Sequence, residues 1–142
     1  MRDIAIAKHN IDIEFIDMTN TKNVKKAIRP NSKLIFLETP TNPSLKLADI
    51  KAIVKIAKKR DILVAVDNTF MTPLLQSPLK LGADMCINSL TKYVGGHADI
   101  IMGSVTTNNE DLAEKLRWNL NTFGGCPSSF DAFLALRGLK TL

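Results

Sequence analysis

Short apolar runs alternate with helix-like segments along most of the chain, and this alternation constrains the fold more than any other feature. The strand-like runs cover residues 11–16, 34–37, 62–66, 85–87 and 100–102. The helix-like segments cover residues 23–28, 48–60 and 77–81, and two further helices begin at Asn109 and after residues 127–129. Runs that are apolar at consecutive positions are typical of strands covered on both faces. The sequence therefore predicts an α/β fold with a mostly parallel sheet and flanking helices.

The length and the hydropathy pattern bound the kind of protein. A chain of 142 residues with 45% hydrophobic residues can bury one core, so we expect residues 1–142 to form a single domain. The longest apolar runs contain about five residues, whereas a membrane-spanning helix needs about 20. No apolar signal segment follows the first residues. We expect a cytoplasmic protein that does not bind a membrane.

Neither the positive charge nor the cysteines and histidines indicate a further binding class. The formal net charge is +5, but the densest basic cluster lies in the last turns of a predicted helix, where cations offset the helix dipole, and no aromatic residues are interleaved with it. We therefore expect no nucleic-acid binding.

The cysteines and histidines do not have the spacing of a metal site, so we expect no bound metal. These residues are His9, Cys86, His97 and Cys126.

Polar and ionisable side chains follow three of the predicted strands. Asn42 comes after the 34–37 run, Asp67 ends the 62–66 run, and Lys92 comes after the 85–87 run. The carboxyl ends of parallel strands meet at one edge of a sheet, so these residues are expected to converge there. A lysine amine can hold a cofactor aldehyde as a Schiff base, and a carboxylate can keep a pyridine nitrogen protonated. Lys92 and Asp67 together indicate a pyridoxal phosphate site, although each alone would be an ordinary loop residue.

Four ordered motifs give the chain a family resemblance. They are Glu-Thr-Pro-Thr-Asn-Pro at 38–43, Val-Asp-Asn-Thr-Phe-Met-Thr-Pro at 66–73, Ser-Leu-Thr-Lys-Tyr at 89–93 and Gly-His-Ala-Asp at 96–99. Together they resemble the Cys/Met-metabolism family of pyridoxal phosphate enzymes, from about residue 11 to the end. The resemblance implies the fold of the large cofactor-binding domain of fold type I pyridoxal phosphate enzymes. Family members are longer at both ends, so we expect residues 1–142 to be a central part of that domain.

The resemblance also assigns roles to residues at matching positions. It makes Lys92 the catalytic lysine that forms the Schiff base with the cofactor, and Asp67 the partner of the pyridinium nitrogen. It makes the hydroxyls of Ser89 and Thr91 donors to the cofactor phosphate. It places Asn42 near the ring hydroxyl and the substrate carboxylate. A simple turn role for Asn42, and backbone capping by the two hydroxyls, are the alternatives that the residues alone leave open.

The activity that the resemblance implies is carbon–sulfur chemistry at the γ-carbon of an amino acid. The favoured reaction is transsulfuration lyase chemistry, in which cystathionine gives cysteine, 2-oxobutanoate and ammonia. γ-Replacement and methionine γ-elimination are alternatives within the family, which also implies a homo-oligomer, commonly a tetramer. An alternative from another class is a catalytically silent module that binds family subunits. We expect the chain to lack the family's substrate-carboxylate arginine and the aromatic residue that stacks on the cofactor.

Overall fold

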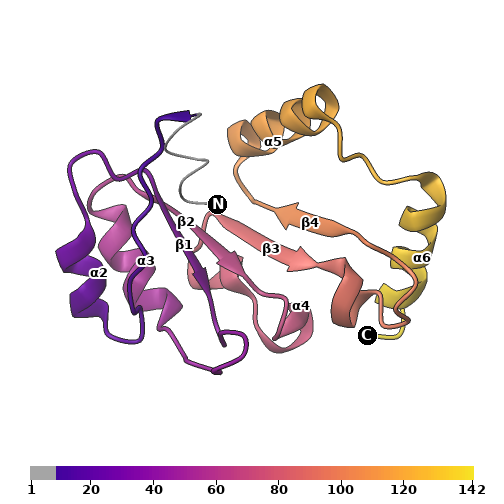
Figure 1. Ribbon diagram of the computed structural model, residues 1–142, viewed down its shortest axis with the longest axis horizontal. Coiled ribbons are helices and arrows are strands. Elements are labelled where there is room, and N and C mark those ends of the chain that lie inside the picture. Colours follow the sequence, from indigo (N-terminus) through magenta and orange to yellow (C-terminus); the bar gives the residue numbers. More distant parts are fainter. Residues whose placement is uncertain (1–8) are drawn as a thin grey trace.

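The computed structural model describes residues 9–142, which contain a four-stranded sheet with the order β1-β2-β3-β4. The strands are β1 (Leu34–Glu38), β2 (Leu63–Asp67), β3 (Met85–Ser89) and β4 (Gly103–Thr106). β1, β2 and β3 are parallel, and β4 runs antiparallel to β3. Figure 1 shows the helices placed around this sheet. The predicted α/β fold with a mostly parallel sheet is confirmed.

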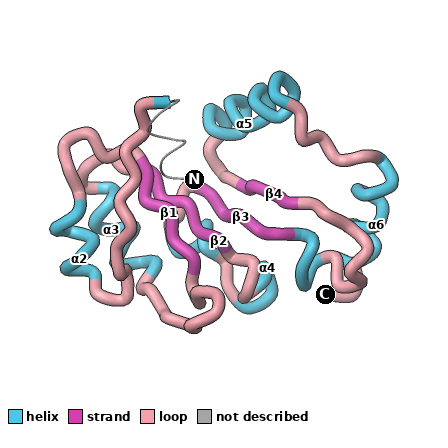
Figure 2. The backbone as a smooth tube through the Cα atoms, in the orientation of Figure 1, coloured by secondary structure: helices cyan, strands magenta, loops and turns pink. Residues whose placement is uncertain are grey.

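Helical segments connect and follow the strands, as Figure 2 shows. The α-helices are α2 (Thr21–Ala27), α3 (Ile50–Lys58), α4 (Thr72–Leu75), α5 (Glu110–Phe123) and α6 (Ser129–Leu139); η1 (Pro78–Leu81) is a 3-10 helix and η2 (Leu90–Val94) is a π turn. Four α-helices begin where a polar side chain accepts a backbone N–H of the first turn, and these caps are Asn20, Asp49, Asn109 and Ser128. Within residues 9–142, no helix has the length and apolar character needed to cross a membrane.

The main core lies between α3 and one face of the sheet. Ile53, Val54 and Ala57 are buried on one side of α3, in the helical spacing that the sequence shows. They belong to the same buried cluster as alternate residues of β1 and β2, such as Leu37 and Val66. Burial of each large aliphatic side chain contributes about 1.5–3 kcal/mol. This packing fixes the parallel strands whose carboxyl ends carry the predicted site.

The other face of β1 and β2 is only partly covered, contrary to the expectation that both faces are covered. Leu34, Phe36 and Leu63 lie on this face, and Leu34 and Phe36 are half exposed, at 50% and 51%. The reason is that Val24 of α2 and the buried side of α3 join the cluster on the opposite face. The continuous apolar runs predicted which residues form strands, but they did not predict which face of the sheet the helices cover.

The predicted strand at residues 11–16 is wrong. Residues 11–16 lie outside the sheet: Ile11 and Phe15 are exposed, and the segment is held by ion pairs from Arg29 to Asp12 and Glu14 at 3.0 and 2.8 Å. Ile16, at the end of the segment, packs against the main core from outside the sheet.

The last predicted strand, at residues 100–102, is displaced along the chain. Ile100 is buried in a cluster with α6, and the backbone N–H and C=O of Met102 are both bonded to Thr91. Because those groups are engaged by the Lys92 turn, strand pairing with β3 begins only at Gly103.

Candidate active site

Asp67 and Ser89 lie at the carboxyl ends of neighbouring strands. Asp67 is the last residue of β2 and pairs in register with Ile87 of β3. Side chains alternate along a strand, so Ser89, two residues beyond Ile87, lies on the same face of the sheet as Asp67. The Asp67 carboxylate is half-buried and its Oδ1 accepts the backbone N–H of Thr69 at 3.0 Å. The structure therefore brings these two predicted site residues to one edge.

The loop after β2 is bonded directly to β3. The Thr69 hydroxyl accepts the backbone N–H of Ser89 at 2.8 Å, and the Asn68 backbone N–H donates to the carbonyl of Ile87 at 2.7 Å. These bonds hold Asp67 and Ser89 in fixed relation across the strand ends. No role for Asn68 or Thr69 was predicted from the sequence. The signal that could have identified them is that they directly follow Asp67 at the end of a buried strand.

Lys92 lies in the π turn η2, immediately after β3. Its backbone, at φ −94° and ψ −126°, leaves the helical conformation within the turn, and its side chain is exposed. Thr91 anchors the turn to the start of β4: its hydroxyl accepts the N–H of Met102 at 3.0 Å and donates to the carbonyl of Met102 at 3.2 Å. The backbone N–H of Gly96 then donates to the carbonyl of Lys92 at 2.8 Å. Lys92 thus extends from a turn that is bonded on both sides.

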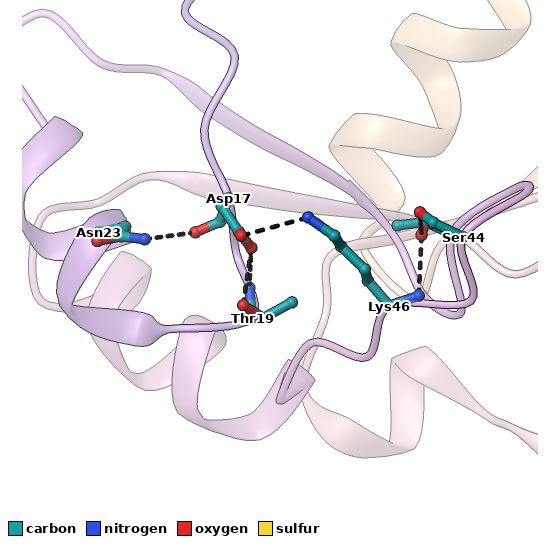
Figure 3. A network of polar contacts seen from close by, with 6 residues as sticks. Asp17, Thr19, Asn23, Ser44 and Lys46 are labelled. Atoms are coloured by element: carbon teal, nitrogen blue, oxygen red, sulfur yellow. Dashed lines mark hydrogen bonds and ion pairs between the residues drawn. The ribbon is translucent and has the colours of Figure 1, made fainter.

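Asn42 lies in the exposed loop between β1 and α3, so it also follows the end of a parallel strand. The loop is closed by the Thr41 hydroxyl, which accepts the N–H of Lys46 at 3.0 Å. Figure 3 shows Lys46 reaching Asp17, and the two side chains form an ion pair at 3.4 Å. Hydrogen bonds from Thr19, with a smaller contribution from Lys46, hold the pKa of the Asp17 carboxyl below its ordinary value. The loop is therefore tethered to the segment before α2.

A buried amide connects the Asn42 loop with the end of β2. Asn68 is fully buried, and its amide nitrogen donates to the carbonyls of Thr72 and Gln76, both at 2.9 Å. The Gln76 amide donates to the Asn68 side-chain oxygen at 2.9 Å and to the Thr39 carbonyl at 3.0 Å. Every polar atom of the Asn68 side chain is paired, so the loops after β1 and β2 are held as one unit. Gln76 carries no sequence signal for this role.

The residues at this edge fit pyridoxal phosphate. Within residues 9–142, Asp67 forms no ion pair and the Ser89 hydroxyl has no hydrogen-bond partner, so a carboxylate and a hydroxyl donor are available at the strand ends, and Lys92 is exposed in the turn that follows β3. The Thr91 hydroxyl can turn its single proton from the Met102 carbonyl to a phosphate while still accepting from the Met102 N–H. The register also places Glu38 beside Asp67, a second carboxylate that the sequence reasoning did not single out.

A separate pocket of about 580 Å³ lies on the opposite face of β3 from Ser89. Cys86 and Asn88 line it together with apolar side chains of α6. Burial raises the pKa of the Cys86 thiol. None of the five predicted site residues lines this pocket, and no three metal-ligating side chains gather among the described residues. The five predicted site residues therefore lie outside this pocket, at or just after the carboxyl ends of the parallel strands.

Comparisons with known proteins identify the family. The family model for Cys/Met metabolism PLP-dependent enzymes matches residues 1–142. Cystathionine gamma-lyase of Rattus norvegicus is 51% identical over 137 residues, which are 96% of this chain and 34% of the rat protein. A probable cystathionine gamma-synthase of Herpetosiphon aurantiacus is 50% identical over 137 residues, 96% of this chain and 43% of that protein.

A solved structure agrees with these relatives over the same extent. Cystathionine gamma-lyase from Lactobacillus plantarum, complexed with L-serine, superposes with a TM-score of 0.93 at 41% identity, over 96% of this chain and 36% of that one. The chain thus spans roughly a third to two fifths of the lengths of these proteins. Since the family match covers every residue and the fold superposes closely, the chain belongs to the Cys/Met metabolism family of pyridoxal phosphate-dependent enzymes.

Proposed function

We propose that this chain is the cofactor-binding part of a carbon–sulfur lyase that converts cystathionine to cysteine, 2-oxobutanoate and ammonia. The observation that carries the proposal is the placement of Asp67 and the Lys92 turn at the carboxyl ends of adjacent parallel strands. The similarity to the rat cystathionine gamma-lyase supports this choice of reaction. A cytoplasmic homo-oligomer acting on a sulfur-containing amino acid is part of the same proposal.

Each site residue has a defined task in this proposal. When bound, pyridoxal phosphate supplies the electron sink that weakens bonds at the substrate α-carbon. Lys92 Nζ would hold the cofactor at its aldehyde group and would move protons at the substrate α- and β-carbons. The Asp67 carboxylate would keep the pyridine nitrogen protonated. Because Thr69 bonds to both Asp67 and Ser89 through its backbone and side chain, the carboxylate keeps a fixed position beside the phosphate-binding hydroxyl.

The remaining three residues bind rather than react. Ser89 and Thr91 would hold the phosphate by hydrogen bonds from their hydroxyls. Asn42, in the loop after β1, would donate hydrogen bonds to the ring hydroxyl and the substrate carboxylate. The Asn68–Gln76 network supports this arrangement because it joins that loop to the strand carrying Asp67.

A second candidate reaction is γ-replacement, in which the sulfur of a thiol takes the place of a leaving group on the γ-carbon, such as the carboxylate of an activated homoserine ester. The probable cystathionine gamma-synthase of Herpetosiphon aurantiacus favours it, because that relative is 50% identical, against 51% for the rat lyase. Both reactions require the same tasks of Lys92 and Asp67. Product analysis with cystathionine and with an activated homoserine ester plus cysteine distinguishes them.

The proposal is tested by trapping the cofactor. The purified chain is mixed with pyridoxal phosphate, its absorbance spectrum is recorded, and borohydride then fixes the cofactor to the lysine that holds it. Peptide mapping is expected to find the main adduct at Lys92, and Lys92→Ala is expected to remove it. A main adduct at another lysine would contradict the assignment. Lys80→Ala, which changes an exposed lysine of η1, serves as the matched control.

A further inference from the structure

The turn that carries Lys92 packs against α6 at unusually close range. Gly138 of α6 is buried, and a Cβ atom added to it would lie under 3.0 Å from the carbonyl oxygens of Val94 and Gly95. Real Cβ atoms essentially never come so close, and backbone carbonyls cannot move aside as a flexible side chain can. Glycine inside a helix costs about 0.5–1 kcal/mol relative to alanine. The close approach to the turn supplies a reason for glycine at this position.

Two further contacts join α6 to the segment that follows the turn. Arg137 forms an ion pair with Asp99, and the hydrogen bond from Arg137 is the main cause that lowers the pKa of the Asp99 carboxyl. Leu134 and Ala135 form a buried cluster with Ile100, and Leu90 and Met102 pack against that cluster. Helix α6 therefore contacts the Lys92 turn at its beginning, at its end and just beyond it. Figure 1 shows α6 beside this turn, at the end of β3.

We propose that Gly138 and Arg137 are positioning residues for Lys92: they seat α6 against the turn and so fix where the lysine amine is presented. The inference rests on the proposed role of Lys92 as the cofactor lysine. Lys92 is exposed, so its own side-chain contacts do not set its position, and the backbone of the turn must do so. A methyl group at residue 138 forces α6 and the turn apart. A displacement of about 1 Å can reduce a reaction rate about a hundredfold.

The test compares two lysines in one sample. The chain is treated with pyridoxal phosphate and borohydride, and peptide mapping measures the adduct at Lys92 and at Lys51, an exposed lysine of α3. The Lys92-to-Lys51 ratio corrects for protein amount and reagent. Gly138→Ala is expected to lower this ratio about tenfold or more below the melting temperature. A ratio equal to that of the wild type in folded Gly138→Ala protein overturns the inference.

A second pair of variants decides the matter if Gly138→Ala does not fold. Arg137→Ala removes the ion pair to Asp99 without adding bulk, and Arg137→Lys keeps a cation. The ratio is expected to fall severalfold in Arg137→Ala and to recover at least in part in Arg137→Lys. An unchanged ratio in Arg137→Ala contradicts the inference. Phe133→Ala, which truncates an exposed side chain on the same helix, is the control and should leave the ratio unchanged.

The same measurement separates failure of this inference from failure of the proposed function. If the wild-type chain labels Lys92 no more than Lys51, the proposed role of Lys92 is wrong, and the inference fails with it. If the wild type favours Lys92 and the α6 variants keep that preference, the role of Lys92 stands. Only the positioning by α6 is then rejected.

Discussion

At the scale of single residues, the role proposed for Asp67 is one that a neutral side chain cannot fill. Asp67→Asn keeps the size and can still accept the Thr69 N–H, which Asp67 Oδ1 accepts at 3.0 Å. An amide cannot hold a proton on the pyridine nitrogen, so we expect trapping at Lys92 to persist while turnover falls about a hundredfold or more. Turnover is measured in rat cystathionine gamma-lyase in which this chain replaces the matching segment.

The control for this substitution is Asp49→Asn. Asp49 caps α3 through the N–H of Ala52 at 2.9 Å, and asparagine caps helices as well as aspartate does. Turnover should therefore be unaffected by the same chemical change at residue 49. Near-normal turnover of Asp67→Asn would show that the carboxylate charge is not used as proposed.

The sequence pattern singles out Asp67 and Lys92 as candidate reacting residues, but not the residues that hold them in place. Asp67 and Lys92 were found because each follows an apolar run, and parallel strands bring such positions to one edge. Asn68, Thr69 and Gln76 were missed because their hydrogen bonds join segments that are distant in sequence. Nothing in the local pattern specifies those partners.

At the scale of elements, Thr91 determines where the Lys92 turn ends and β4 begins. Thr91→Val removes the hydroxyl that bonds to both backbone groups of Met102. Loss of a partner for a largely enclosed N–H costs about 1–3 kcal/mol, and we expect a decrease in the free energy of unfolding at the lower end of that range. Urea unfolding measures it. Thr91→Ser keeps the hydroxyl and should lose much less; equal losses would assign the effect to the methyl group instead.

The ion pair between α6 and the segment after the turn predicts a dependence on pH. Arg137 lowers the pKa of the Asp99 carboxyl below its ordinary value of 3.8. Since the folded-state pKa is the lower one, the stabilisation is present above 3.8 and is lost as the pH falls through the folded-state value. NMR titration of the carboxyl carbon should give a pKa below 3.8 in the wild type and a higher one in Arg137→Ala. Identical pKa values in the two proteins would exclude the pairing in solution.

Elements with local signals were predicted more accurately than elements defined by distant contacts. The helices beginning after Asn109 and Ser128 have side-chain caps that the sequence displays directly. Residues 100–102 are apolar and strand-like, yet burial of Ile100 under α6 and the bonds between Met102 and Thr91 shift the strand to Gly103. Tertiary contacts, invisible in a local window, overrode the local preference.

At the scale of the whole molecule, the predicted site residues do not lie in an enclosed pocket of the described structure. Lys92 and Asn42 are exposed, and the pocket of about 580 Å³ lies on the opposite face of β3 from Ser89. On the partly covered face of β1 and β2, Leu34 and Phe36 are half exposed, and contiguous exposed apolar side chains are typical of interaction surfaces. Both alternatives, a lyase and a catalytically silent module that binds family subunits, are therefore tested on this chain.

We expect the 142-residue chain alone to bind pyridoxal phosphate weakly and to show no measurable cystathionine cleavage. Orientation of reacting groups can be worth on the order of 7–11 kcal/mol, and an exposed lysine beside an open strand edge supplies little of it. The assay measures cysteine and 2-oxobutanoate from the chain alone and from rat cystathionine gamma-lyase carrying this chain in place of its matching segment, which is 34% of that protein. Lys92→Ala in the carrier is the negative control. Equal rates from the two proteins would show that residues 1–142 already hold the substrate in place, whereas activity in neither would favour the silent module.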